Sequence, residues 1–257
     1  MPMLDLETHQ LHYRIDGAEG PWLVFCNSLG TDLRMWDPQV AELSSHFRVL
    51  RHDRRGHGLS TAPEGMYSLA DLGGDVIALL DALGIGSVHY CGLSIGGLVA
   101  QWLAVNAPQR LDRVVACATA ARIGSAESWN ARIAEVQAHG LPPLLGATAE
   151  RWFGAAFRAT QPGQVAAILE SFAATSVRGY AGCCAALAAA DLRTDITRIE
   201  IPLLAIAGDQ DPVCPPGDLQ AIAGSVGNGR VAVLPGRHLL NIESPAAFNA
   251  ALLQFLQ

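Results

Sequence analysis

A serine enclosed by glycines constrains this 257-residue chain more than any other feature. The run Gly92-Leu93-Ser94-Ile95-Gly96 follows a predicted buried strand, Val88–Cys91, and precedes an apolar helical run, Leu98–Ala104. Glycines two positions to either side of a serine permit a turn so tight that side chains there would collide with neighbouring backbone. The pattern predicts that Ser94 stands exposed at a strand-to-helix turn, beside the positive end of the helix. Because an ordinary turn would also fit the pentapeptide alone, its interpretation depends on the rest of the chain.

A candidate acid follows the serine at the end of a later predicted strand. The apolar run 201–207 ends in Gly-Asp-Gln-Asp, so two carboxylates stand on the loop after it. The spacing favours Asp211, three residues beyond the glycine, as the partner of a catalytic histidine. Asp209 is the alternative, and it could equally shape the turn.

A candidate base follows the last predicted strand, 231–234. His238 lies on the loop after that strand, and His139 is the one other histidine that follows Ser94. His139 falls in a helical region rather than at a strand end, so we predict that His238 is the general base. His52 and His57 precede the serine, whereas the resemblance given next implies a base that follows it, so they are poor candidates.

The order serine, acid, histidine, each placed after a strand, resembles the α/β-hydrolase superfamily over essentially the whole chain. That resemblance implies a mostly parallel, eight-stranded sheet flanked by helices. Continuous apolar runs are typical of strands buried on both faces of such a sheet. They occur at Trp22–Cys26, Phe47–Arg51, Val88–Cys91, Arg113–Ala118 and Ile201–Ala207, and two shorter segments, Leu4–Thr8 and Leu11–Ile15, predict an opening antiparallel hairpin.

The sheet pattern lapses between the sixth and seventh predicted strands. Residues 122–191 are rich in alanine and helical in pattern, with breaks at Gly140 and at a Gln-Pro-Gly turn. We predict that this block is a helical cap inserted after strand six, with residues 1–121 and 192–257 forming the hydrolase core. The resemblance implies that the cap covers the nucleophile and shapes the substrate cavity.

The loop after the third strand narrows the resemblance. In α/β-hydrolases this loop supplies one backbone N–H of the oxyanion hole, usually within His-Gly-x-Gly, but here Asn27 and Ser28 replace the first two residues. The resemblance assigns the two oxyanion donors to the backbone N–H groups of Leu29 and Ile95. The run 27–36, Asn-Ser-Leu-Gly-Thr-Asp-Leu-Arg-Met-Trp, is similar to the corresponding run of 3-oxoadipate enol-lactonases, enzymes of aromatic degradation.

This narrower resemblance implies hydrolysis of a small lactone through an acyl-enzyme on Ser94, without a cofactor or a metal. The alternatives are another serine hydrolase, such as a carboxylesterase, a C–C bond hydrolase or a perhydrolase, or a receptor that keeps the fold to sense a small ligand. An enol-lactone of this kind carries a carboxylate, which must meet a cationic or strongly donating group if it is buried. The candidates are Arg132, one helical turn from Trp129, and Arg34 near the oxyanion loop.

Composition excludes several other classes. The net charge is −7, and the 17 basic residues are scattered, which argues against nucleic-acid binding. All 17 are arginine, so Schiff-base chemistry on a lysine is excluded. The first residues include acids where a signal peptide needs positive charge, and no apolar run reaches the roughly 18 residues of a membrane span, so we expect a cytoplasmic protein without a membrane partner. The six cysteines lack C-x-x-C spacing and are expected to be reduced core thiols rather than metal ligands.

Overall fold

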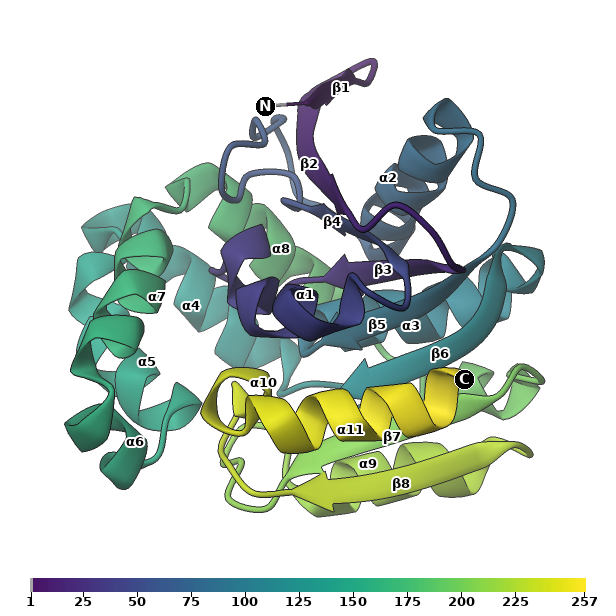
Figure 1. The fold of residues 1–257 in the computed structure, drawn as a ribbon. Helices are drawn as coiled ribbons and strands as arrows, with labels where there is room; N and C mark the ends of the chain where they lie inside the picture. The colour runs from purple at the N-terminus through teal and green to yellow at the C-terminus, as the bar shows by residue number, and fades with distance from the viewer. Residues whose placement is uncertain (1) are drawn as a thin grey trace.

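The computed structural model describes residues 2–257, which form one eight-stranded sheet in the order β1-β2-β4-β3-β5-β6-β7-β8 (Figure 1). The first two pairings, β1 with β2 and β2 with β4, are antiparallel, and every later pairing is parallel. The predicted mostly parallel sheet is therefore confirmed. The strands are Met3–Asp5 (β1), Gln10–Asp16 (β2), Trp22–Cys26 (β3), Arg48–His52 (β4), Val88–Leu93 (β5), Leu111–Cys117 (β6), Leu203–Gly208 (β7) and Gly229–Leu234 (β8).

Burial of the strands follows their position in the sheet. Every residue of the inner strands β5 and β7 is buried, because helices cover both faces there. Strand β8 lies at the edge and leaves Val231 and Val233 almost half exposed. The opening hairpin differs from the prediction in the length of its strands. The first ends early, at Asp5, where the N–H of Leu6 donates to the carbonyl oxygen of His9 at 2.9 Å, and the second is longer than predicted.

Helices pack on both faces of the sheet (Figure 1). On one face α1 contacts α11; on the other α2 contacts α3, α3 covers β5 and β6, and α9 covers β7 and β8. Helix α2 begins with a capping box, in which the side chain of Ser68 accepts from the N–H of Asp71 and the Asp71 carboxylate accepts from the N–H of Ser68. These helices are Asp37–Leu43 (α1), Leu69–Ala82 (α2), Ile95–Asn106 (α3), Pro216–Ser225 (α9), Leu240–Glu243 (α10) and Pro245–Leu256 (α11).

Five more helices lie between β6 and β7 in the sequence. Figure 1 shows them grouped at the end of the sheet toward which the parallel strands point, with α4 packed against α8. We use the word cap for residues 122–191, whose limits remain a prediction. The helices are Ala126–His139 (α4), Leu145–Trp152 (α5), Ala155–Thr160 (α6), Pro162–Ala174 (α7) and Val177–Ala189 (α8); short 3-10 helices lie at Leu33–Trp36, Pro108–Arg110, Pro142–Leu144 and Asp195–Arg198.

All six cysteines are free thiols and all are buried, as predicted for core residues. Within residues 2–257, every helix is too short or too polar to cross a bilayer. The cysteines are Cys26, Cys91, Cys117, Cys183, Cys184 and Cys214.

Candidate active site

The turn between β5 and α3 holds Ser94 in a strained conformation. Its φ is 60° and its ψ is −119°, and a non-glycine residue in such a region costs about 1–3 kcal/mol. A Cβ added at Gly92 would collide with the carbonyl oxygen of Gly96, and one added at Gly96 would collide with that of Cys26. The hydroxyl of Thr119 donates to the carbonyl oxygen of Ser94 at 2.8 Å and ties the turn to the segment after β6. Both glycines are therefore required by the close approach of three backbone segments.

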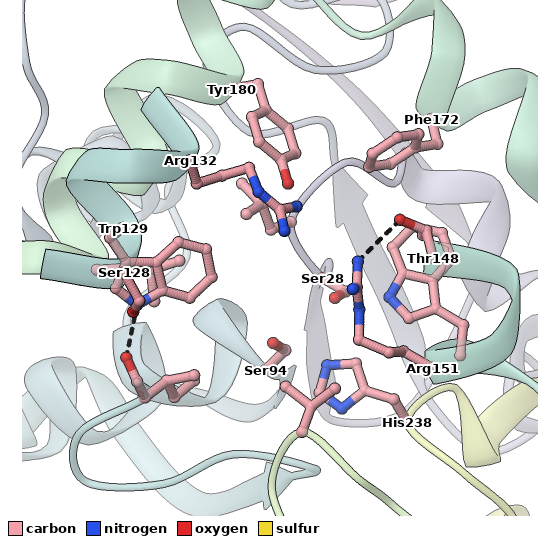
Figure 2. Close-up of a pocket in the computed structure, with 15 residues that line it drawn as sticks. Ser28, Ser94, Ser128, Trp129, Arg132, Thr148, Arg151, Phe172, Tyr180 and His238 are labelled. Carbon is pink, nitrogen blue, oxygen red and sulfur yellow. Dashed lines mark hydrogen bonds between the residues drawn. The ribbon is translucent and has the colours of Figure 1, made fainter. Parts of the chain in front are cut away.

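Asp211 and His238 lie on the loops after β7 and β8 and form a buried pair. Nδ1 of His238 is 2.9 Å from Oδ2 of Asp211, and the two residues are only 2% and 4% exposed. The other carboxylate oxygen, Oδ1, accepts from the N–H groups of Val213 at 2.8 Å and Cys214 at 3.2 Å. Both oxygens are thus engaged, which fixes the carboxylate toward the imidazole. Figure 2 shows the ring of His238 beside Ser94 in one cavity.

Asp209, the alternative acid, is bonded elsewhere. Its Oδ1 accepts from the N–H of Gly236 at 2.9 Å, and the residue is exposed. The preceding Gly208 lies so close to the carbonyl oxygens of Gly236 and Arg237 that a Cβ there would collide with both. Asp209 therefore shapes the loop that leads to His238, whereas Asp211 contacts the imidazole itself.

The loop after β3 meets the serine turn at backbone level. Leu29 lines the cavity, and among the hydrogen bonds within residues 2–257 none is donated by its backbone N–H. Ile95 is the first residue of α3, so its N–H has no carbonyl partner in the preceding turn of helix. Asn27 stands where a histidine is usual; its Nδ2 donates to the carbonyl oxygen of His52 at 3.0 Å and its Oδ1 accepts from Nε1 of Trp36 at 2.9 Å. Asn27 therefore bonds the loop to the end of β4 and to the 3-10 helix that follows the loop.

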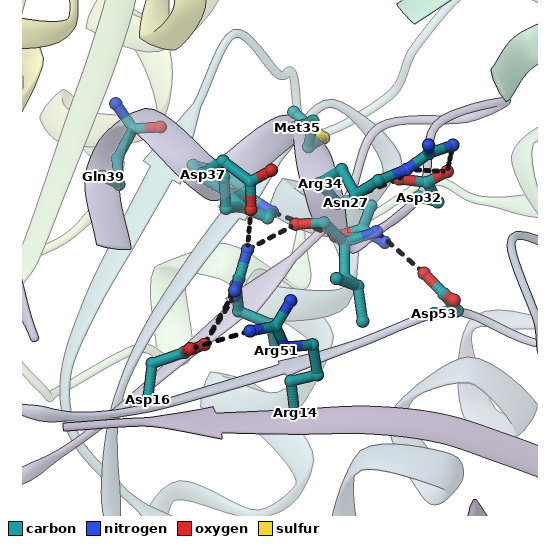
Figure 3. A network of polar contacts seen from close by, with 12 residues as sticks. Arg14, Asp16, Asn27, Asp32, Arg34, Met35, Asp37, Gln39, Arg51 and Asp53 are labelled. Atoms are coloured by element: carbon teal, nitrogen blue, oxygen red, sulfur yellow. Dashed lines mark hydrogen bonds and ion pairs between the residues drawn. The ribbon is translucent and has the colours of Figure 1, made fainter. Parts of the chain in front are cut away.

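An ionic network centred on a buried arginine holds the residues that follow this loop (Figure 3). Arg51, only 1% exposed, donates to the carbonyl oxygen of Leu33 at 3.1 Å and pairs with Asp37 at 2.6 Å and Asp16 at 2.7 Å. Oδ1 of Asp53 accepts from the N–H of Leu33 at 2.7 Å. The 3-10 helix that begins at Leu33 is thereby anchored to β2 and β4, which stabilises the loop that precedes it.

A second buried cation supports the same loop from within the core. Arg54 donates to the carbonyl oxygens of Asn27 and Ser28 and lies 3.6 Å from the sulfur of Cys26. Burial opposes ionisation of Cys26, but the charge of Arg54, helped by two neighbouring side chains, outweighs it and lowers the pKa of the thiol to about 6. An ionised Cys26 would serve as the counter-ion of a guanidinium that donates to two residues next to Leu29.

A cavity of about 230 Å³ lies between these groups and the cap (Figure 2). The ring of Phe172 makes edge-on contacts with Trp152 and Tyr180, at centroid distances of 5.5 and 5.7 Å. Nε1 of Trp129 donates to the carbonyl oxygen of Ile123 at 2.6 Å, which fixes the indole. The cavity is lined by Ser28, Leu29, Ser94, Ile123, Ser128, Trp129, Arg132, Thr148, Arg151, Trp152, Phe172, Tyr180, Leu187, Val213 and His238.

Two arginines from different cap helices face this cavity (Figure 2). Arg132 of α4 pairs with the half-exposed Glu135 at 3.2 Å, and Arg151 of α5 donates to the hydroxyl of Thr148 at 3.1 Å. Among the ion pairs formed by residues 2–257, none includes Arg151. Burial, and next the positive charge of Arg132, lower the pKa of Arg151. A bound anion would relieve this repulsion, and Ser94 lines the same cavity as the two guanidinium groups.

Residues 21–245 match the family model of the alpha/beta hydrolase fold. This chain belongs to the α/β-hydrolase fold family. It is 44% identical to 3-oxoadipate enol-lactonase 2 of Acinetobacter baylyi, over 94% of this chain and 91% of the relative. It is 42% identical to 3-oxoadipate enol-lactonase 1 of the same bacterium, over 93% and 90%. The crystal structure of the enol-lactonase from Burkholderia xenovorans LB400 superposes with a TM-score of 0.97 at 44% identity, covering 99% of both chains. The predicted resemblance is confirmed.

Of the cap and loop residues predicted to bind substrate in this α/β-hydrolase, the structure brings two to the cavity. Trp129 and Arg132 line it, but Arg34 does not. The guanidinium of Arg34 pairs with Asp32 at 2.6 Å and its side chain is 62% exposed, so it has a partner outside the cavity. Sequence reasoning missed Arg151. Its spacing from Thr148 and Trp152 places all three on one face of α5, a signal that becomes useful only once that face is known to meet the cavity.

One set of side chains has the spacing of a metal site. The potential ligand atoms of Asp211, Cys214 and His238 lie within 4.8 Å of one another. Burial, and then the charge of Asp211, raise the pKa of the Cys214 thiol well above its usual value, so the sulfur stays protonated. The neutral thiol is a poor ligand and the other two groups are bonded to each other, so these residues fit an α/β-hydrolase triad better than a metal centre.

Proposed function

We propose that this protein hydrolyses 3-oxoadipate enol-lactone to 3-oxoadipate in the breakdown of aromatic compounds. The proposal is supported by 44% identity to a protein named 3-oxoadipate enol-lactonase over nearly its full length. The observation that carries it in this chain is the pair Arg132 and Arg151, which face the cavity that also holds Ser94. In a small lactone that bears a carboxylate, the lactone carbonyl would lie at Ser94 and the carboxylate at the two arginines.

The chemistry we propose is acyl transfer through a Ser94–His238–Asp211 triad. His238 accepts the hydroxyl proton of Ser94, whose oxygen attacks the lactone carbonyl while the N–H groups of Leu29 and Ile95 stabilise the oxyanion. Each such donor is worth about 2.7–4 kcal/mol of transition-state stabilisation. The ring C–O bond then breaks, and the released enolate takes a proton and becomes a ketone. Water, deprotonated by His238, hydrolyses the acyl-enzyme without need of a cofactor.

In this proposal Arg132 and Arg151 bind the carboxylate that the lactone carries outside its ring. That carboxylate takes no part in bond breaking, so its role is to orient the carbonyl toward Ser94. Guanidinium groups suit the task because they donate two parallel hydrogen bonds to a carboxylate. We place the reaction in the cytoplasm, where six buried thiols would remain reduced.

The test compares the enol-lactone with a neutral ester of similar size, in Arg132→Ala, Arg151→Ala and the control Arg34→Ala. Loss of either cavity arginine should lower kcat/KM for the enol-lactone about 10²-fold, because a hydrogen bond to a charged group contributes about 1.5–3 kcal/mol. Hydrolysis of the neutral ester should change little, and Arg34→Ala should resemble the wild type on both substrates. Equal losses on both substrates would contradict a role in recognition. Efficient turnover of neutral esters alone would instead assign a general carboxylesterase.

A further inference from the structure

The short loop that carries His238 is bonded to the cap on both sides of the histidine. The guanidinium of Arg237 donates to the carbonyl oxygen of Glu150, and the N–H of Leu239 donates to the carbonyl oxygen of Trp152 at 3.1 Å. Both acceptors belong to the last turn of α5. The same turn carries Arg151, whose guanidinium faces the cavity. The position of α5 and that of the catalytic loop are therefore joined directly.

One carboxylate also connects the His238 loop to the end of α5. Oε1 of Glu243, in α10, accepts from the N–H of Arg237 at 3.2 Å and from the N–H of Gly154 at 3.0 Å. Arg237 immediately precedes His238, and Gly154 lies between α5 and α6. A Cβ added at Gly154 would stand 3.3 Å from Oε2 of Glu243, so glycine allows this approach. A single oxygen thus holds the catalytic loop and the chain that leaves α5.

Glu243 does not itself line the cavity. Any effect on the reaction must therefore pass through the backbone of Arg237 to the imidazole, or through Gly154 to α5. The other contacts near His238 use different groups: Asp211 holds the imidazole ring, and Asp209 accepts from the N–H of Gly236, the residue before Arg237. Of the two backbone N–H groups that flank the histidine, that of Leu239 donates to Trp152, and within residues 2–257 that of Arg237 donates to Glu243 alone.

We propose that Glu243 is a positioning residue for the general base, and that it fixes His238 and the arginine-bearing helix α5 in one relative arrangement. The proposal rests on the triad proposed above. A general base displaced by about 1 Å loses roughly 10²-fold in rate, so a contact distant from the bond being broken can control kcat.

The experiment compares Glu243→Gln with Glu243→Ala, using the exposed cap glutamate Glu170 as a control in Glu170→Ala. Glutamine keeps an oxygen that can accept from both N–H groups but removes the charge, whereas alanine removes the acceptor. We expect Glu243→Ala to lower kcat by about 10- to 100-fold on both a neutral ester and the enol-lactone, with a smaller change in KM. Glu243→Gln should stay within about 3-fold of the wild type, and Glu170→Ala should match it.

Proton NMR supplies a readout that a purely structural role would not change. The Nδ1 proton that His238 shares with Asp211 should give a far-downfield resonance in the wild type and in Glu243→Gln. This resonance should broaden or disappear in Glu243→Ala at a temperature where circular dichroism shows that variant to be fully folded. If Glu243→Ala does not fold, Glu243→Asp takes its place, because a carboxylate one methylene shorter cannot reach both N–H groups.

Three results would overturn the inference. An unchanged kcat in folded Glu243→Ala would show that the contact does not position the base. Equal loss in Glu243→Gln and Glu243→Ala would show that charge, rather than the shared acceptor, matters. An unchanged downfield resonance in a slow Glu243→Ala would separate the defect from His238. Ser94→Ala distinguishes these failures from failure of the triad itself, since turnover by that variant would contradict the proposed function whatever Glu243 does.

Discussion

Two carboxylates on the loop after β7 lie two residues apart and bind different partners. Asp211 accepts from the imidazole of His238, whereas Asp209 accepts from a backbone N–H. We expect Asp211→Asn to lower kcat by roughly 10³- to 10⁴-fold, because an amide can hold the imidazole in the wrong tautomer. Asp209→Asn should stay within about 10-fold of the wild type, since its remaining oxygen can still accept from Gly236. Steady-state kinetics on one ester decide the matter, and the reverse ranking would move the catalytic acid to Asp209.

The lowered pKa of Cys26 predicts a pH dependence of stability. Its pKa is about 6 in the folded protein, whereas an unfolded thiol has a pKa of about 8.5. Between these values the unfolded chain binds one more proton, so this group stabilises the fold increasingly as the pH rises and loses its contribution as the pH falls toward 6. The slope is at most about 1.4 kcal/mol per pH unit.

The measurement is urea unfolding of the wild type and of Cys26→Ala at about pH 6 and about pH 8.5. Alanine leaves the guanidinium of Arg54 without its counter-ion, so the variant should be less stable at both values. The difference in free energy of unfolding between the two proteins should be larger at the higher pH. A difference that does not change with pH would mean that the sulfur remains a neutral thiol.

At the scale of elements, the close contact between β3, the serine turn and α3 requires a glycine at position 96. Gly96→Ala would drive a Cβ into the carbonyl oxygens of Cys26 and Asn27, so we expect destabilisation of about 1–3 kcal/mol. Because Asn27 leads to Leu29, kcat should fall as well. Gly74→Ala is the matched control: a Cβ in this part of α2 meets nothing within 4 Å, and alanine should stabilise the helix by about 0.5–1 kcal/mol. Thermal unfolding of the two variants tests the contrast.

The elements that could be predicted are those in which every residue has the same surroundings, so that one kind of residue recurs along the element. Strands covered on both faces are continuously apolar, so β3, β5 and β7 could be recognised from composition alone. Ser94, Asp211 and His238 could be located because loops that follow parallel strands converge at one edge of the sheet. Exposure of Val231 on β8 could not be predicted, since an edge strand and an inner strand can have the same apolar sequence.

The residues that could not be predicted are those set by contacts between distant segments. Arg151 reaches the cavity because of how α5 is rotated against the core, and helical periodicity does not say which face meets a cavity. Glu243 and Gly154 are 89 residues apart in the sequence and share one hydrogen bond. Arg34 was predicted for its nearness in sequence to the oxyanion loop, but a carboxylate two residues away, Asp32, holds it.

Across the whole molecule, the proposed bond-breaking groups and the proposed recognition groups belong to different parts of the chain. The proposed triad and the proposed donor Leu29 lie on loops or turns after strands, the proposed donor Ile95 is the first residue of α3, and backbone contacts hold these segments in place. The arginines and most of the aromatic side chains of the cavity come from the cap. Substitutions in the cap should therefore change which esters are hydrolysed, while substitutions on the sheet loops should change how fast all of them are hydrolysed.

Because all six thiols are buried, their reaction with a thiol reagent can show which part of the unmodified protein opens. Cys183 and Cys184 lie in α8 of the cap, whereas Cys91 and Cys117 lie in β5 and β6. A water-soluble maleimide reacts only with a thiol that solvent can reach, so the count of adducts per molecule in a mass spectrum records which part has opened. Two adducts confined to α8 would mean that the cap detaches while the sheet stays closed. Six adducts gained together would mean that cap and sheet open as one cooperative unit.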